Sequence, residues 1–156
     1  MNFDVKEALR RVAALEKQFD ALYRSVGTQL CLSDCVMWVL YFIGTADQPL
    51  SQQELIGKMM FPKQTINSAV MGLVRKGLVE LKAVPGTRNR KTILLTEAGK
   101  AVAEKTVLRM VQAELQAVEV MGQERMECFA ELYTAFFTTL RESFEREGLV
   151  REEGRY

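Results

Sequence analysis

The strongest chemical feature of the chain is positive charge concentrated in one segment. Residues 62–91 contain a single acidic residue, Glu80, against seven basic ones: Lys63, Arg75, Lys76, Lys82, Arg88, Arg90 and Lys91. The rest of the chain carries fourteen basic and nineteen acidic residues, so a net charge of +1 conceals a local charge of +6. Contacts with phosphates need local positive potential, and this segregation favours a face that binds a polyanion. The alternative is a chance cluster on a solvated surface.

Two start signals for a helix coincide just before this segment. Ser51 and Glu54 have the spacing of a capping box, and Leu50 and Leu55 have that of a hydrophobic staple. The helix is expected to end before Pro62, because proline is tolerated in the first turn of a helix but not in its interior. A second helix is then predicted to start at about Pro62.

This second helix has one apolar and one polar face. Its apolar residues have the i, i+3, i+4, i+7, i+8 spacing of a buried stripe: Ile66, Ala69, Val70, Leu73 and Val74. The opposite face carries Gln64, Asn67, Ser68, Met71 and Arg75. Short hydrogen-bonding side chains near a helix N-terminus are what a helix-turn-helix presents to base edges in the major groove. An ordinary surface helix is also polar on its outer face.

A β-hairpin with a basic tip is predicted directly after this helix. Gly77 ends the helix, and apolar residues at positions 79, 81 and 83 alternate with charged ones as in a half-buried strand. Pro85 and Gly86 indicate a turn, residues 87–91 form an exposed basic tip, and residues 92–96 form the returning strand. Arginines on such a wing enter a minor groove or bind the phosphates beside it. The order of elements is that of a winged helix-turn-helix.

In these segments the chain resembles the MarR (multiple antibiotic resistance regulator) type of bacterial transcription factors. The most specific matches are residues 73–79 (LVRKGLV) and 95–100 (LTEAGK). The resemblance implies a mainly α fold with a small β-hairpin wing and a single domain over residues 1–156. In that fold, a winged helix-turn-helix over residues 32–96 is flanked by dimerisation helices in residues 1–30 and 97–148.

The resemblance also implies which residues contact double-stranded DNA. Those on the second helix of the motif are Lys63, Gln64, Thr65, Asn67 and Ser68, and those on the wing are Arg88, Asn89, Arg90 and Lys91. The chain departs from the family pattern at Asn89, where an acidic residue is usual, and at Ser68, where many relatives have an arginine. The operator sequence therefore does not follow from the resemblance.

Amphipathic helices are predicted at both ends of the chain. One covers residues 2–26 and is interrupted at Gly27, and the other covers residues 124–147 with a wide aromatic stripe in which Cys128 is placed as a small core residue. Such a stripe needs a partner surface, either the first helix or a second copy of the chain. We expect a homodimer, because both ends are amphipathic, with contacts from Leu9, Val12, Phe129, Phe136, Phe137 and Leu140.

Two further helices are expected between these elements. Residues 34–43 are apolar almost throughout, which predicts a helix buried on most sides, and residues 97–121 predict one long helix ended by Gly122.

A two-fold dimer would place its groove-binding helices roughly 34 to 36 Å apart on a pseudo-palindromic operator.

Two kinds of control are compatible with the sequence. The resemblance implies a cleft for a small aromatic effector, which Trp38, Tyr41 and Phe42 would line, although these side chains equally suit a core. Some proteins of this family sense peroxide through a thiol, and Cys31 and Cys35 are the candidates here. The N-terminus of the helix that follows Ser33 would lower a thiol pKa, whereas Asp34 would raise it.

The composition argues against catalysis and against a membrane or secreted protein. The chain has no histidine, which removes the commonest general base and most zinc sites, so we expect no enzyme, metal or cofactor. It has no run of 18 apolar residues and no secretory signal, which predicts a cytoplasmic protein. The expected function is a dimeric transcriptional regulator, a repressor released by a small molecule. The alternatives are a winged-helix module that binds protein and a thiol-based redox-sensing regulator.

Overall fold

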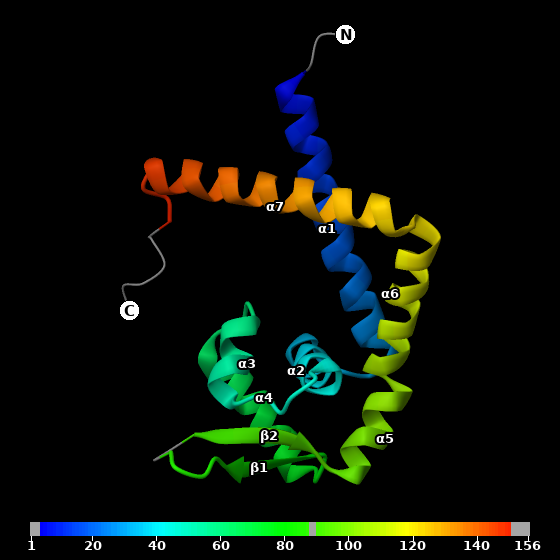
Figure 1. The fold of residues 1–156 in the computed structure, drawn as a ribbon, viewed down its shortest axis with the longest axis vertical. Coiled ribbons are helices and arrows are strands. Elements are labelled where there is room, and N and C mark those ends of the chain that lie inside the picture. Colours follow the sequence, from blue (N-terminus) through cyan, green and yellow to red (C-terminus); the bar gives the residue numbers. More distant parts are fainter. Residues whose placement is uncertain (1–3, 88–89, 151–156) are drawn as a thin grey trace. The chain divides into compact units, whose positions relative to one another are not determined.

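The computed structural model of the chain describes residues 4–87 and 90–150. The elements in chain order are α1 (Val5–Gln29), α2 (Asp34–Thr45), α3 (Gln52–Lys58), α4 (Lys63–Arg75), β1 (Val79–Ala83), β2 (Lys91–Leu95), α5 (Glu97–Lys105), α6 (Val107–Met121) and α7 (Gln123–Arg146) (Figure 1). The chain forms two compact units, Met1–Val111 and Gln112–Tyr156, which are described separately below. A mainly α fold with one β-hairpin confirms the expected fold class.

Helix α2 is the centre of the first unit. It contacts α1, α3, α4, α5 and β2, and its residues Met37, Val39 and Leu40 are completely buried. Around it pack fully buried side chains from the other elements: Leu55, Ile66, Val70, Ala103 and Val107. The prediction of a helix buried on most sides is confirmed. Its apolar sequence thus reflects a central position in the core.

Helix α3 begins with the predicted capping box. The Ser51 hydroxyl accepts a hydrogen bond from the Glu54 N–H at 3.2 Å, and the Glu54 carboxylate accepts one from the Ser51 N–H at 2.7 Å. The same residue joins the start of α3 to the hairpin, because Ser51 forms a β-bridge with Thr92 and the Ile93 N–H donates to the Leu50 carbonyl at 2.8 Å. Ser51 is buried at this junction.

Helix α4 buries the face that the sequence predicts. Ile66, Val70 and Leu73 are buried in the core. The helix ends at Arg75, and Gly77 just beyond it has φ +68° and donates its N–H to the Val74 carbonyl at 2.9 Å. Glycine adopts this left-handed conformation without a steric penalty, and the predicted end of the helix is confirmed.

Strands β1 and β2 form an antiparallel hairpin with Val79 opposite Leu95 and Ala83 opposite Lys91. Val79 and Ile93 are buried against the core, which agrees with the predicted half-buried strands. The returning strand begins at Lys91, one residue earlier than expected. Figure 1 shows the two strands running side by side from α5 towards the tip, whose residues 88–89 lie outside the described part.

The first helix extends further than predicted. Helix α1 does not stop before Gly27 but continues to Gln29. The Leu32 carbonyl oxygen lies 3.3 Å from where a Cβ on Gly27 would stand, and the absence of a side chain leaves room for this close approach. The chain then turns at Cys31, which has φ +55°, and the Leu32 N–H donates to the Gly27 carbonyl at 2.9 Å. Gly27 therefore allows a tight turn instead of ending the helix.

The helix expected over residues 97–121 is divided in two at Thr106. This residue leaves the helical conformation (φ −123°, ψ −97°), and its hydroxyl donates to the Val102 carbonyl at 2.7 Å. Cys128 was expected to be a core residue but is exposed. The apolar spacing around it does mark one face of α7, yet no described residue of this helix is buried in the single chain.

No single helix in residues 4–87 and 90–150 is both long and apolar enough to cross a membrane. Helices α1 and α2 meet the length and composition criteria only when taken together, as a pair bent by 88°.

A close approach at Gly99 holds α5 against the base of the hairpin. The Thr96 hydroxyl donates to the Gly77 carbonyl at 2.6 Å and accepts from the Gly99 N–H at 3.0 Å, while the Thr96 N–H donates to the Leu78 carbonyl. A Cβ on Gly99 would overlap that Leu78 carbonyl, which is backbone and cannot turn away.

We therefore expect Gly99→Ala to lower the free energy of unfolding by about 2 kcal/mol or more, since the backbone must shift to relieve the overlap. The control is Gly57→Ala, because a Cβ at Gly57 in α3 meets nothing within 4 Å. It should leave stability unchanged or raise it by up to about 1 kcal/mol through helix propensity. Urea unfolding followed by circular dichroism measures both variants. Equal stability of the two would show that α5 can shift away from the hairpin.

Candidate nucleic-acid interface

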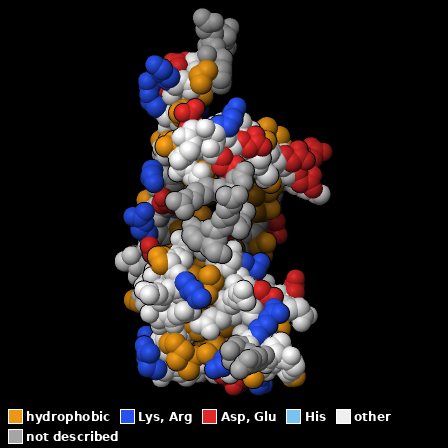
Figure 2. Space-filling view, turned by 90° about the vertical axis from the view of Figure 1, so that its left-hand side faces the viewer, with side chains coloured by type: hydrophobic (Ala, Val, Ile, Leu, Met, Phe, Trp, Pro, Cys, Tyr) orange, Lys and Arg blue, Asp and Glu red, His pale blue; other side chains and the backbone are white. Residues whose placement is uncertain are grey.

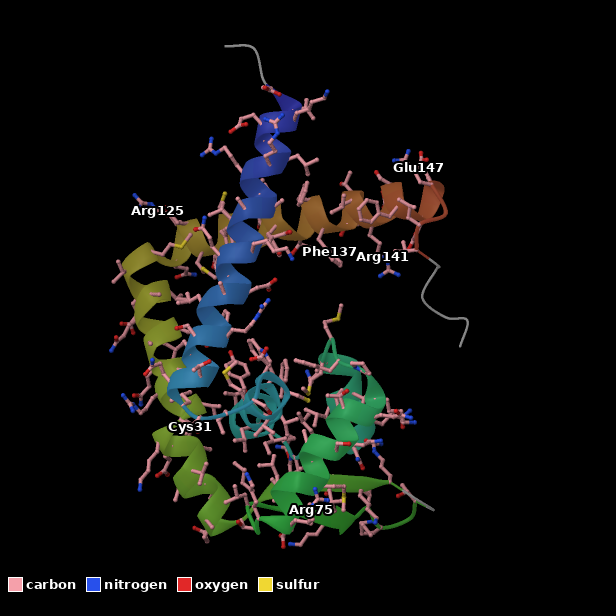
Figure 3. The ribbon with its side chains drawn as sticks, turned by 180° about the vertical axis from the view of Figure 1, so that it is seen from behind. Cys31, Arg75, Arg125, Phe137, Arg141 and Glu147 are labelled. Atoms are coloured by element: carbon pink, nitrogen blue, oxygen red, sulfur yellow. The ribbon has the colours of Figure 1, made fainter. Side chains whose placement is uncertain are left out.

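The outer face of α4 carries a stripe of accessible side chains. Gln64, Ser68, Met71 and Arg75 lie three or four residues apart, which places them on one side of the helix, and all four are exposed. Lys63 and Thr65 are exposed beside them, and Asn67 borders the same face. Figure 3 labels Arg75 at the end of α4 that adjoins the strands. The predicted polar face is therefore accessible within the first unit, with one apolar member, Met71.

An open hollow of about 620 Å³ joins this face to the hairpin. Its lining comes from α3, α4 and the start of β2: Ser51, Gln52, Gln53, Ile56, Lys63, Asn67, Arg90 and Lys91. The structure thus brings together four residues that the sequence analysis assigned to two separate elements, namely Lys63, Asn67, Arg90 and Lys91. Figure 2 views the chain from the hairpin-tip side, and its lower part shows Lys and Arg side chains among polar and hydrophobic ones.

Asn67 is held by a residue of the preceding helix. The Gln52 Nε2 donates a hydrogen bond to the Asn67 Oδ1 at 2.8 Å, in a partly buried position. Gln52 lies in the first turn of α3, and the bond joins residues 15 positions apart in the chain. The orientation of the Asn67 amide is therefore coupled to α3.

Arg90 forms an ion pair between the wing and α3. Its Nη2 donates to the Glu54 Oε1 at 2.7 Å, and both side chains are about half exposed. Hydrogen bonds from Ser51, followed by the charge and hydrogen bond of Arg90, hold the pKa of the Glu54 carboxyl below its usual value. An exposed pair of this kind contributes little to stability, and the guanidinium keeps further N–H donors for a phosphate.

The positions of the other two predicted wing residues, Arg88 and Asn89, lie outside the described part of the chain. Lys91 is described and exposed at the start of β2.

A second hollow, of about 360 Å³, lies among α1, α2 and Phe61, which precedes α4. It is lined by Phe19, Asp20, Tyr23, Arg24, Asp34, Met37, Trp38 and Phe61. Of the three predicted effector-cleft residues, Trp38 lines this hollow. Tyr41 and Phe42 pack against Trp38, with ring centroids 5.3 and 6.2 Å away, and so support its position.

The two candidate thiols have different surroundings. Cys35 is buried in α2, and burial raises the pKa of its thiol, which disfavours the reactive thiolate. Cys31 is exposed at the turn between α1 and α2, where Figure 3 labels it.

Comparison with known proteins identifies the fold. Residues 32–88 match the model of the MarR family. The chain has the MarR winged-helix fold. No curated protein has a significantly similar sequence.

Solved structures of MarR family regulators share this fold along most of the chain. A MarR family regulator from Neisseria meningitidis is 20% identical, with 94% of this chain and 99% of that chain covered and a TM-score of 0.77. A putative MarR family regulator from Listeria monocytogenes, complexed with a 26mer DNA, is 16% identical, with 97% and 99% covered and a TM-score of 0.66. BpsR of Bordetella bronchiseptica, whose DNA binding is regulated by 6-hydroxynicotinic acid, is 15% identical, with 81% and 98% covered and a TM-score of 0.60.

The part of the candidate interface that comes from α3 was not predicted from the sequence. Gln52, Gln53 and Glu54 border the hollow or bind its residues, yet the local pattern showed only the capping role of Glu54. The contacts of Gln52 with Asn67 and of Glu54 with Arg90 join residues 15 and 36 positions apart. The amide side chains at the start of α3 could have indicated this contribution, but polar side chains are equally expected on any helix that faces solvent.

Proposed function

We propose that the chain is a transcriptional regulator that binds double-stranded DNA as a homodimer. The proposal rests on the hollow in which the outer face of α4 meets the basic start of β2. A shared fold with a regulator complexed with DNA supports it. Such a protein acts in the cytoplasm of a bacterial cell, where the DNA is, and binds without carrying out a chemical reaction.

In this proposal α4 enters the major groove and the wing lies over the adjoining backbone or minor groove. Gln64, Asn67 and Ser68 face the base edges, while Lys63, Thr65, Lys91 and the wing residues Arg88 to Arg90 face phosphates or the minor groove. The exposed Met71 offers an apolar contact for a thymine methyl group. The acidic remainder of the chain keeps the positive potential confined to this face.

The dimer part of the proposal rests on apolar side chains that the chain leaves exposed. Leu9 of α1 is 54% exposed and Phe137 of α7 is 56% exposed, and Phe137 projects from its helix in Figure 3. Phe129 stacks on Tyr133 of the same helix at 5.8 Å, and both remain exposed. A second copy would cover these residues together with Val12, Phe136 and Leu140, and residues 1–30 and 97–148 would supply the interface.

The regulatory part of the proposal is a repressor that a small aromatic compound releases from DNA. The hollow beside Trp38 has aromatic walls, one cation, Arg24, and two carboxylates, Asp20 and Asp34, and in this proposal Arg24 binds the acid group of an aromatic effector. The regulation of BpsR by 6-hydroxynicotinic acid supports this part, since BpsR has the same fold.

Arg88→Ala should weaken binding to the duplex that flanks the protein's own gene, and by a similar factor for every sequence tested. The slope of log affinity against log salt should fall by about one unit, because one phosphate contact is lost. Lys105→Ala is the control, because it removes the same charge from α5, which does not border the hollow. Gel-shift titrations at several salt concentrations measure both. An unchanged slope in Arg88→Ala would exclude a phosphate contact by this residue.

Phe137→Glu should convert the dimer into a monomer, because the exposed apolar stripe of α7 then carries a charge at its centre. Sedimentation should give the wild type twice the 17.7 kDa chain mass and the variant that mass alone. Thr138→Glu adds the same charge to a neighbouring exposed position off the stripe and should stay dimeric. Circular dichroism checks that both remain helical. A monomeric wild type would contradict the proposed assembly.

Trp38 is the only tryptophan, so its fluorescence reports on the second hollow. Titration with 6-hydroxynicotinic acid and related aromatic acids should quench it saturably and weaken DNA binding over the same concentrations. Arg24→Gln should lose this response, since the carboxylate loses its cation, whereas Arg11→Gln on the same helix should keep it. If Arg24→Gln responds as the wild type does, the ligand does not occupy this hollow.

A further inference from the structure

The bond between Gln52 and Asn67 gives one side chain of the interface a defined hydrogen-bonding direction. The Gln52 Nε2 donates to the Asn67 Oδ1 at 2.8 Å, and both residues line the hollow between α3, α4 and β2. Asn67 lies at the edge of the α4 face that carries Gln64 and Ser68. A residue on one helix thus orients an amide on the next.

The orientation of an asparagine amide decides which bases it can bind. A free asparagine binds adenine with both ends, since its oxygen accepts from N6 while its NH₂ group donates to N7. In this structure the Asn67 oxygen accepts from Gln52 and is thereby turned towards α3, which leaves both N–H bonds of the Asn67 NH₂ group for a ligand. An NH₂ group matches bases that offer acceptors in the major groove, and guanine offers two, N7 and O6.

We propose that Gln52 is a specificity-determining residue that makes Asn67 a hydrogen-bond donor and so favours guanine over adenine at the base pair facing Asn67. Gln52 acts through Asn67 and is a positioning residue for the contact. This inference rests on the proposed function, because it assumes that α4 enters the major groove.

The bond is not what joins the two helices. Leu55 of α3 and Ile66 of α4 are completely buried in the common core, and α3 is capped independently by Ser51. The polar bond lies at the rim of this core, where its loss leaves the packing intact. A change at Gln52 is therefore expected to alter base preference without unfolding the motif.

Gln52→Glu is the decisive variant because a carboxylate accepts hydrogen bonds but cannot donate them. The Asn67 NH₂ group then turns to the introduced carboxylate, and the Asn67 oxygen faces the groove as an acceptor. At the base pair facing Asn67, guanine should lose its advantage and bases with an exposed NH₂ group, adenine and cytosine, should gain. The change in the guanine-to-adenine preference should be about tenfold or larger, as for one well-formed base contact.

The measurement is binding of the full-length protein to a library of duplexes, based on the DNA flanking its own gene, with each base pair varied in turn. Gln53→Glu is the matched control, because Gln53 is the next residue and lines the same hollow. It adds the same negative charge but leaves the bond between Gln52 and Asn67 in place. It should weaken binding to all sequences alike and leave the preference unchanged.

Asn67→Ala identifies the base pair that faces Asn67, because the protein should no longer prefer one base at that position. When Gln52→Glu is added to Asn67→Ala, the base preference should not shift further. Gln52→Met, which cannot bond Asn67, should relax the preference without reversing it, and it serves if Gln52→Glu does not fold.

The inference is overturned if Gln52→Glu lowers binding uniformly as Gln53→Glu does, or if its shift persists without Asn67. A wild type that binds no duplex at all would instead overturn the proposed function, and this inference with it. If the wild type binds DNA but Gln52→Glu and Gln52→Met both keep its base preference, this inference is overturned and the proposed function stands.

Discussion

The arrangement of the interface depends on one buried serine. Ser51 is enclosed where α3 starts, so its polar atoms must be satisfied inside the protein. Its hydroxyl caps α3, its N–H binds Glu54, and its backbone pairs with Thr92 of β2. These bonds tie the start of a helix and the returning strand of the hairpin to the same residue. The wing therefore has a set position relative to the helix-turn-helix.

Two polar contacts extend from this junction to the side proposed to face DNA. Glu54, whose other oxygen binds the cap, holds Arg90 at the start of the wing, and Gln52, the residue after Ser51, holds Asn67 on α4. At the far end of the hairpin, Thr96 and Gly99 fasten β2 and α5 to the end of α4. A mobile basic surface would lose conformational freedom on binding DNA, whereas one held at both ends loses less.

The two units of the chain differ in how they bury apolar surface. The first unit has a core around α2 whose side chains are enclosed by the chain itself. In the second unit α7 carries an aromatic stripe with no buried residue among those described. That difference is the physical basis for proposing that a second copy of the chain completes the fold, and a two-fold dimer would also supply the paired α4 helices that a pseudo-palindrome requires.

The sequence by itself determined the features that depend on neighbouring residues. These are the capping box at Ser51, the buried stripe of α4, its end at Gly77 and the alternation in the hairpin, since each arises from a local backbone preference or a simple period. Tertiary structure decided that α1 continues through Gly27, that the chain bends at Thr106, and that Gln52 and Glu54 hold Asn67 and Arg90. These outcomes rest on contacts between residues distant in the chain or on close backbone approach, and periodicity carries no information about either.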